Sequence, residues 1–185
     1  MKRSISQCLA VAMLTAAANF NALAGASPGE VDFTNIAEPG KNAEYVCIHI
    51  GHNLTSLASR LVEKRQPEAA KLLRSVQLIH LNVVGLTDEN RDVLQKRVHE
   101  FRDQLDKQGW ARVVTVKEKD GDDVGVFVKT RGDEAVEGVV VTVLNGKEKV
   151  VLINVVGDIK PEQIAALGEA LNIDPLKEAG ALVRK

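Results

Sequence analysis

Residues 136–156, VEGVVVTVLNGKEKVVLINVV, carry the clearest structural signal in this sequence. It holds two runs rich in β-branched residues, 136–144 and 147–156, on either side of Asn145-Gly146. β-branched side chains favour strands, and Asn-Gly is the strongest short signal for a hairpin closed by a two-residue type I′ turn. Both runs are apolar on both faces, so we expect at least one of these strands to lie in the centre of a sheet.

Further strands are predicted on both sides of this hairpin in the sequence. Residues 45–50 and 76–84 have apolar residues at every second position, which is typical of strands. Residues 110–118 and 124–130 flank Asp120-Gly121-Asp122, whose residue types favour a second hairpin turn. The sequence therefore predicts a sheet of six strands.

One sequence pattern occurs twice. Leu81-Asn82-Val83-Val84-Gly85 is matched 72 positions later by Ile153-Asn154-Val155-Val156-Gly157, and each copy is followed by a short acidic turn and an amphipathic helix. A strand–turn–helix unit used twice fits an α+β fold: a two-layer domain with helices packed on one face of a mostly antiparallel sheet.

The clearest predicted helix spans residues 88–107, with Thr87 as its N-cap. Its apolar residues follow the spacing of a single stripe, which we expect to face the sheet. The residues of this stripe are Leu94, Val98, Phe101 and Leu105.

Three shorter helices are also predicted. One begins near Asn53, the expected N-cap, and a second opens at Pro67. Pro161 opens a closing helix whose inward residues are expected to be Ile164, Leu167 and Leu171. The first of these helices has apolar residues at helical spacing. They are Leu54, Leu57, Ala58, Leu61 and Val62.

The beginning of the chain has the features of a Sec-type signal peptide. Lys2 and Arg3 precede a short apolar run, and Ala22-Leu23-Ala24 or Ala24-Gly25-Ala26 supplies the small residues of a cleavage site. The run is too short to span a bilayer. We expect a periplasmic or secreted protein in which the cleaved chain keeps one cysteine, Cys47, and depends on its core rather than on a disulfide.

These observations divide the chain into four parts. Residues 1–24 are the signal peptide, and residues 25–43, which show no sustained periodicity, are interpreted as a flexible leader. Residues 44–173 form a single α+β domain, and residues 174–185 are a tail.

Composition excludes some partners. The 185 residues include 24 Lys and Arg and 25 Asp and Glu, a net charge of −1, and aromatic residues make up 3%. Without excess positive charge or stacking side chains, nucleic-acid binding is not expected.

The order of these elements resembles a bacterial envelope family known as domain of unknown function 4252. The resemblance is carried by the strand at 45–51, Asn82-Val83-Val84-Gly85 before a helix, Gly109-Trp110 before a strand, and the hairpin at 139–158. It implies a small exported bacterial α+β protein. The family has no established reaction, so it implies no catalytic residue.

Three residues could carry chemistry on one sheet face. If the strands at 45–50 and 76–84 are neighbours, Cys47, His49 and His80 can share a polar face, as ligands of zinc or copper or as a thiol with a base. No CxxC or HExxH spacing supports a metal site, and a free cysteine is usually a small packed residue. We therefore favour a packed role, and we assign no metal, cofactor or catalytic residue.

Asn82 and Asn154 interrupt the apolar strands at matching places of the repeated pattern. They can be polar walls of a ligand groove, together with Cys47, His49 and His80, or each can cap the turn that follows by bonding local backbone. The capping interpretation is preferred.

The sequence as a whole favours a small exported, non-enzymatic binding or interaction protein of the bacterial envelope. Its expected partner is another envelope protein, and no membrane-spanning segment is expected after signal cleavage. The alternative is a motif-poor hydrolase or metal-handling protein that uses Cys47, His49 and His80. A structural component that self-associates through a strand edge is a third hypothesis.

Overall fold

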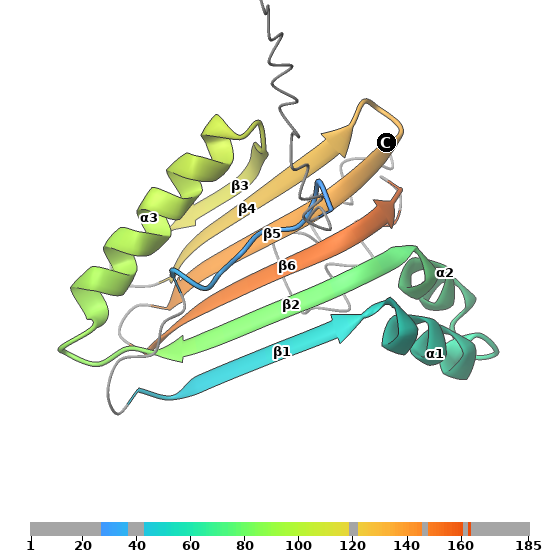
Figure 1. The fold of residues 1–185 in the computed structure, drawn as a ribbon, viewed down its shortest axis with the longest axis horizontal. Coiled ribbons are helices and arrows are strands. Elements are labelled where there is room, and N and C mark those ends of the chain that lie inside the picture. Colours follow the sequence, from blue (N-terminus) through green and yellow to red (C-terminus); the bar gives the residue numbers. More distant parts are fainter. Residues whose placement is uncertain (1–26, 37–42, 119–121, 146–147, 161–162, 164–185) are drawn as a thin grey trace, which may run out of the picture.

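One antiparallel sheet of six strands, in the order β1-β2-β6-β5-β4-β3, organises the computed structural model (Figure 1). The structure describes residues 27–36, 43–118, 122–145, 148–160 and 163. The strands are β1 (Tyr45–Gly51), β2 (Val76–Gly85), β3 (Ala111–Lys117), β4 (Asp122–Arg131), β5 (Ala135–Asn145) and β6 (Lys149–Ile159), and the helices are α1 (His52–Val62), α2 (Pro67–Ser75) and α3 (Arg91–Lys107).

The β-branched hairpin lies in the middle of the sheet. β5 pairs with β6 over the whole hairpin, and β4 and β2 then pair with their outer edges. Most residues of both strands are buried, on both faces. The predicted α+β fold with a largely antiparallel sheet is therefore confirmed, and so is the central place of this hairpin.

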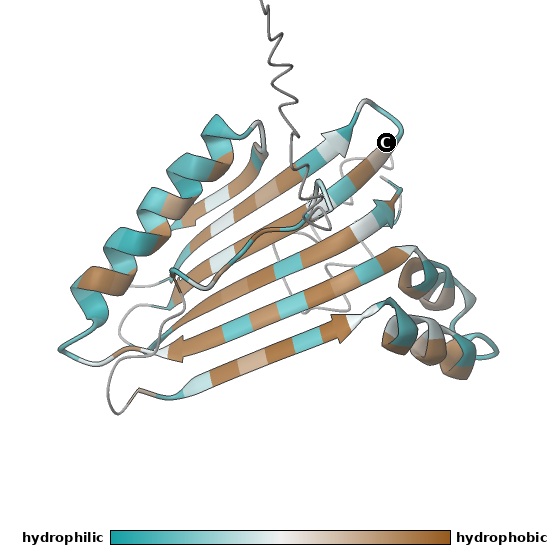
Figure 2. Ribbon diagram, in the orientation of Figure 1, coloured by the Kyte–Doolittle hydropathy of each residue, from teal (hydrophilic) through white to brown (hydrophobic). Residues whose placement is uncertain are grey.

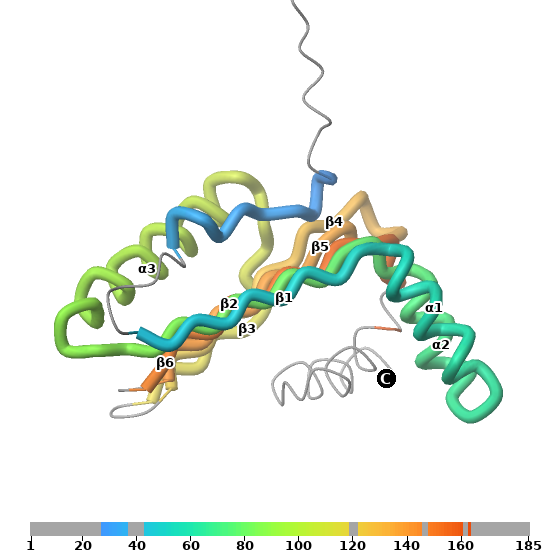
Figure 3. Tube along the Cα trace, turned by 60° about the horizontal axis from the view of Figure 1, so that its bottom comes forward, coloured from blue at the N-terminus to red at the C-terminus, as the bar shows by residue number. Residues whose placement is uncertain are grey.

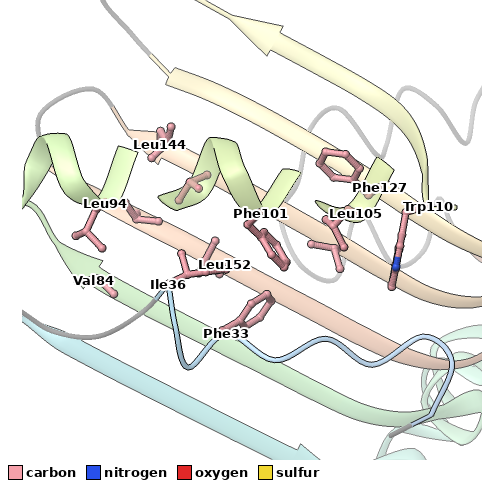
Figure 4. Close-up of a cluster of buried hydrophobic side chains, with 13 residues drawn as sticks. Phe33, Ile36, Val84, Leu94, Phe101, Leu105, Trp110, Phe127, Leu144 and Leu152 are labelled. Atoms are coloured by element: carbon pink, nitrogen blue, oxygen red, sulfur yellow. The ribbon is translucent and has the colours of Figure 1, made fainter. Parts of the chain in front are cut away.

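Helix α3 lies across one face of the sheet, which we call the α3 face (Figures 1 and 3). The predicted stripe is confirmed, because Leu94, Val98, Phe101 and Leu105 are all at most 7% exposed. They pack on sheet residues such as Phe127 (Figure 4). The outer side of α3 is hydrophilic (Figure 2). Burial of this stripe removes apolar surface from water and holds the two layers together.

Residues 27–36 form a second covering element, which we call the strap. It runs over the α3 face beside the helix (Figure 3), with Phe33 0% and Ile36 5% exposed. The Phe33 ring meets the Phe101 ring edge-on at a centroid distance of 5.7 Å. The interpretation of this part of residues 25–43 as a flexible leader is therefore wrong, because two apolar side chains anchor it in the core.

The opposite face of the sheet is also apolar. Its cluster consists of strand residues from β2, β4, β5 and β6, and Leu72 of α2 joins it at one end. α1 and α2 lie side by side at that end of the sheet rather than against α3 (Figure 3).

Two predicted helix caps are wrong. α1 has its N-cap at Gly51 rather than Asn53, because the helix begins directly after β1. The N-cap of α3 is Asn90 rather than Thr87. Thr87 and Asn90 instead bond each other across a turn before the helix, where the backbone N–H of Thr87 donates to Oδ1 of Asn90 at 2.7 Å.

The hairpin between β5 and β6 differs from a two-residue Asn-Gly turn. Asn145 pairs with Lys149, and the backbone N–H of Glu148 donates to the carbonyl of Asn145 at 2.9 Å. The turn therefore starts at Asn145 instead of being centred on Asn145 and Gly146. The signal peptide, the Asp120-Gly121 turn residues, and the closing helix with its tail after Pro161 lie outside the described residues.

An ion pair that was not predicted from the sequence joins α3 to the sheet. Arg102 is 5% exposed and donates from Nη1 to Asp123 at 2.6 Å and from Nε to Thr142 at 2.8 Å. A buried guanidinium requires such partners, because an unpaired charge in the interior is strongly destabilising.

Replacement of Phe101 by alanine should lower the free energy of unfolding by about 3–5 kcal/mol, since it leaves a cavity under α3 and removes the contact with Phe33. Lys96→Ala, on the solvent-exposed side of the same helix, should change the free energy of unfolding by less than about 0.5 kcal/mol. Urea unfolding of the two variants beside the parent measures both. Equal midpoints for the two variants would show that the stripe is not the core of this layer.

Candidate functional site

The five polar residues singled out in the sequence lie on the α3 face in two adjacent rows. Across the strands, His49 faces His80 and His80 faces Asn154. One row further along, Cys47 faces Asn82. The prediction that Cys47, His49 and His80 share a sheet face therefore agrees with the strand register, and Asn82 and Asn154 share that face too.

The Cys47 thiol lies next to the His80 ring. The Sγ atom is 3.7 Å from Nε2 of His80, and the ring centroids of His49 and His80 are 5.6 Å apart. Cys47 and His49 are exposed, while His80 is half-buried against Phe33, with ring centroids 5.2 Å apart. The geometry thus joins a solvent-accessible thiol to a nitrogen that can accept its proton.

Burial lowers the pKa of His80 below its ordinary value of 6.5, and the neighbouring His49 lowers it further. The carboxylates of Asp32 and Glu30 on the strap act in the opposite direction but are weaker. His80 is therefore neutral near pH 7. The pKa of Asp32 is itself lowered, chiefly by the hydroxyl of Thr34 and then by its backbone N–H, which donates at 2.8 Å.

These residues do not form a prepared catalytic or metal centre in the described part of the chain. No described residue hydrogen-bonds the second ring nitrogen of His80, so nothing of the kind that orients a catalytic base is present there. Among the described residues, no group of three or more His, Cys, Asp or Glu side chains is arranged to hold a metal ion.

Asn154 holds the strap on the sheet. Its side chain is fully buried, its Nδ2 donates to the carbonyl of Gly29 at 2.9 Å, and its Oδ1 accepts from the N–H of Val31 at 3.1 Å. Nδ2 also donates to the carbonyl of Val139 on β5 at 3.2 Å. The preferred interpretation of Asn154 as a cap for its own turn is therefore wrong, because its partners on the strap lie more than a hundred residues away in the sequence.

The strap meets β5 at two glycines. A Cβ atom on Gly29 would lie 2.0 Å from the carbonyl oxygen of Glu137, and one on Gly138 would lie 2.4 Å from the carbonyl oxygen of Gly29. Only two residues without side chains allow the two backbones to come this close. This contact places Gly29 within reach of Asn154.

Asn82 has a different role from Asn154. It is 2% exposed, and its Oδ1 has no hydrogen-bond partner among the described residues, so the capping interpretation fails here as well. The two copies of the repeated pattern lie on the neighbouring antiparallel strands β2 and β6. Only in the β6 copy does the asparagine side chain lie close enough to the strap to hydrogen-bond its backbone.

Two of the hollows between described residues are relevant here, one on this face and one at the end of the sheet. The first, of about 170 Å³, lies between the strap and the histidine pair and is lined by Glu30, Val31, Asp32, His49 and His80. The second, of about 690 Å³, lies between α2 and the ends of β2 and β6. Lys71 in the second hollow pairs with Glu68 at 2.8 Å. The first is too small for anything but a very small ligand, since ligand pockets usually measure about 300–1,000 Å³.

The strap residues of the site were missed in the sequence. Asp32 and Phe33 stand in a stretch with several glycines and prolines, which indicates a loop, and their partners lie far away in the sequence. Two signals were available: Gly138 in the interior of an otherwise β-branched strand, which indicates a close backbone approach, and the apolar pair Phe33 and Ile36.

Asn154→Leu should lower the free energy of unfolding by about 2–4 kcal/mol, because it leaves the partly buried carbonyl of Gly29 and N–H of Val31 without partners. Asn82→Leu is the matched control and should cost less than about 1 kcal/mol, since Oδ1 of Asn82 accepts no hydrogen bond from any described residue. Urea unfolding measures both, and chymotrypsin should cleave at Phe33 faster in the Asn154 variant alone. Equal cleavage rates in the two variants would show that Asn154 does not hold the strap on the sheet.

The lowered pKa of His80 links folding to pH. The unfolded chain binds a proton near pH 6.5 that the folded chain resists, so the contribution of His80 to stability is complete above that pH and decreases as the pH falls toward the lowered pKa. In His80→Gln, the urea midpoint should therefore fall less than in the parent between about pH 7.5 and about pH 5. An equal fall of the urea midpoint in the parent and in His80→Gln would show that the pKa of His80 is not lowered by folding.

Comparison with known proteins gives one match. No curated protein and no solved structure matches the chain significantly. The model of a protein family described as a domain of unknown function (DUF4252) matches residues 40–167, which is most of the chain and includes all nine helices and strands of the described residues. The chain therefore belongs to the domain of unknown function 4252 family.

Proposed function

We propose that this protein is a small exported interaction module of the bacterial envelope that binds an extended segment of another envelope protein along strand β1. The observation that carries this proposal is the outer edge of β1. Residues 45–49 are all exposed, and the strand contains no Lys, Arg, Asp, Glu or Pro. Among the described residues, no strand pairs with that edge.

Such an edge is unusual because unpaired backbone groups invite association. Proteins commonly protect their edge strands with charges, bulges or proline. β3, at the other edge of the same sheet, is protected in this way, since it carries Arg112 and Lys117 and a register shift between Arg112 and Val114. β1 presents Val46 (47% exposed) and Ile48 (40% exposed) instead. The contrast supports β1 as the binding edge.

Strand addition gives affinity through the backbone and specificity through side chains that alternate between the two faces. On the α3 face, a partner next to β1 meets Tyr45, Cys47 and His49, and on the opposite face it meets Val46 and Ile48. The polar residues of the site then serve recognition rather than a reaction. This use agrees with the exposure of Cys47 and His49, and with the lack of any orienting group for His80 among the described residues.

Export is supported by the signal-peptide features of the first 24 residues. The described residues contain no helix that is long and apolar enough to cross a membrane. The proposal therefore places the folded domain in the periplasm or outside the cell, with a mature chain that begins at Gly25 or Ser27.

A photoreactive amino acid at position 46 tests the binding edge in intact cells. The exposed Val113 on the protected edge β3 is the matched control, because its exposure of 51% is close to that of Val46. We expect a defined crosslink to another envelope protein from position 46 and none from position 113. Mass spectrometry of the captured chain should show a start at Gly25 or Ser27.

Two outcomes contradict this function. Equal crosslinking from the two positions would show that β1 is not a selective edge. A crosslink to a second copy of the chain, with a native mass that rises with concentration and returns to the monomer in Val46→Lys, would identify self-association instead.

A further inference from the structure

We propose that helix α1 docks this protein on the surface of an anionic phospholipid bilayer. α1 carries an outward stripe of three leucines at helical spacing: Leu54, Leu57 and Leu61 are 57%, 55% and 76% exposed. Exposed apolar patches on folded domains mark sites of interaction with proteins or membranes. This stripe lies on a different element from the β1 edge, so the inference goes beyond the interaction module proposed above.

The orientation of α1 is the reverse of an ordinary amphipathic helix. Its buried residues are Thr55 and Ser59, which lie on the side of α1 turned away from the leucines. The hydroxyl of Thr55 donates to the carbonyl of Val76 at 3.0 Å, and that of Ser59 donates to the carbonyl of Ser56 at 2.7 Å. Small hydroxyl side chains therefore face the protein, and the leucines face outward.

Charge near the stripe favours an anionic surface. The segment from His52 to Ser75 holds five basic and two acidic residues, a net charge of +3 in a chain whose net charge is −1. Both acidic residues are paired within α1, α2 and the turn between them, Glu68 with Lys71 and Glu63 with Arg74. The remaining basic residues are exposed and form no ion pair with any described residue. They are Arg60, Lys64 and Arg65.

The placement of these cations fits a membrane interface. Arg60 follows Leu57 by three residues and flanks the stripe on the surface of the helix, and Lys64 lies in the turn directly after α1, three residues beyond Leu61. Long basic side chains beside an apolar stripe can reach lipid headgroups while the leucines enter the boundary between headgroups and acyl chains. α1 and α2 project from the end of the sheet (Figure 3), so the stripe can reach a flat surface.

The test uses the chain from Gly25 onward, which keeps every described residue and lacks the apolar signal segment. It is sedimented with vesicles of phosphatidylcholine mixed with phosphatidylglycerol, and with vesicles of phosphatidylcholine alone. We expect binding to the anionic vesicles at low salt, at least about tenfold stronger than to the neutral ones, because each cation at the surface is worth about a fivefold gain. High salt should weaken the binding.

Two double variants, in α1 and the turn after it, and one control variant separate the contribution of the leucines from that of the basic residues. Leu57→Ser with Leu61→Ser should abolish vesicle binding, and Arg60→Glu with Lys64→Glu should reduce it at least about tenfold on anionic vesicles. Val93→Ser with Val113→Ser, at exposed valines on α3 and β3, should leave it unchanged. Urea midpoints confirm that all variants remain folded, which their exposure predicts.

Three results would overturn the proposal: no binding to anionic vesicles, binding that survives the leucine variant, or a dimer in solution that the leucine variant dissolves, since the stripe would then belong to a second copy. The Val46→Lys variant should still bind vesicles. Absence of a crosslink from the photoreactive residue at position 46, together with vesicle binding by the parent protein, would refute the proposed function and leave the membrane surface in place.

Discussion

The central hairpin of the sheet is apolar on both faces, and this constraint accounts for the arrangement of the other elements. β5 and β6 bury most of their side chains on both faces, and so neither face can be left to water. On the α3 face, two elements together form the cover, since the helix contributes its stripe and the strap contributes Phe33 and Ile36 (Figure 4). The stripe alone does not complete this layer, which is why a segment of loop-like composition joins the core.

Strap and sheet are connected through polar contacts that only this packing can satisfy. The two glycines bring the strap backbone onto β5, and Asn154 then binds a carbonyl and an N–H of the strap from within the sheet. These hydrogen bonds fix the position of the strap on the sheet, since a shifted strap would leave buried polar groups unpaired. The strap also brings Asp32 and Glu30 close to His80 and closes the small hollow beside the histidine pair.

The surfaces that remain open are therefore informative. β1 is an uncharged edge, whereas β3 is protected by charges and a bulge. α1 turns its leucines outward, whereas α3 turns its leucines inward. Each pair compares two elements of the same kind within one domain, so the difference does not come from the overall composition of the chain. A strand edge and a basic, leucine-lined helix at its end together suit a protein that connects a partner to a surface.

The strands, the α+β class and the inward stripe of α3 could be predicted from the sequence, because alternation in strands and the spacing of apolar residues in a helix are local properties. The sequence also placed Cys47, His49 and His80 on one sheet face, once their strands were neighbours. Four features became visible only in the folded arrangement: the strap, the role of Asn154, the buried Arg102 and the outward leucines of α1. A local pattern shows that a helix has an apolar side but not whether that side finds a cover, and hydrogen bonds between residues 29 and 154 exist only after the sheet has assembled.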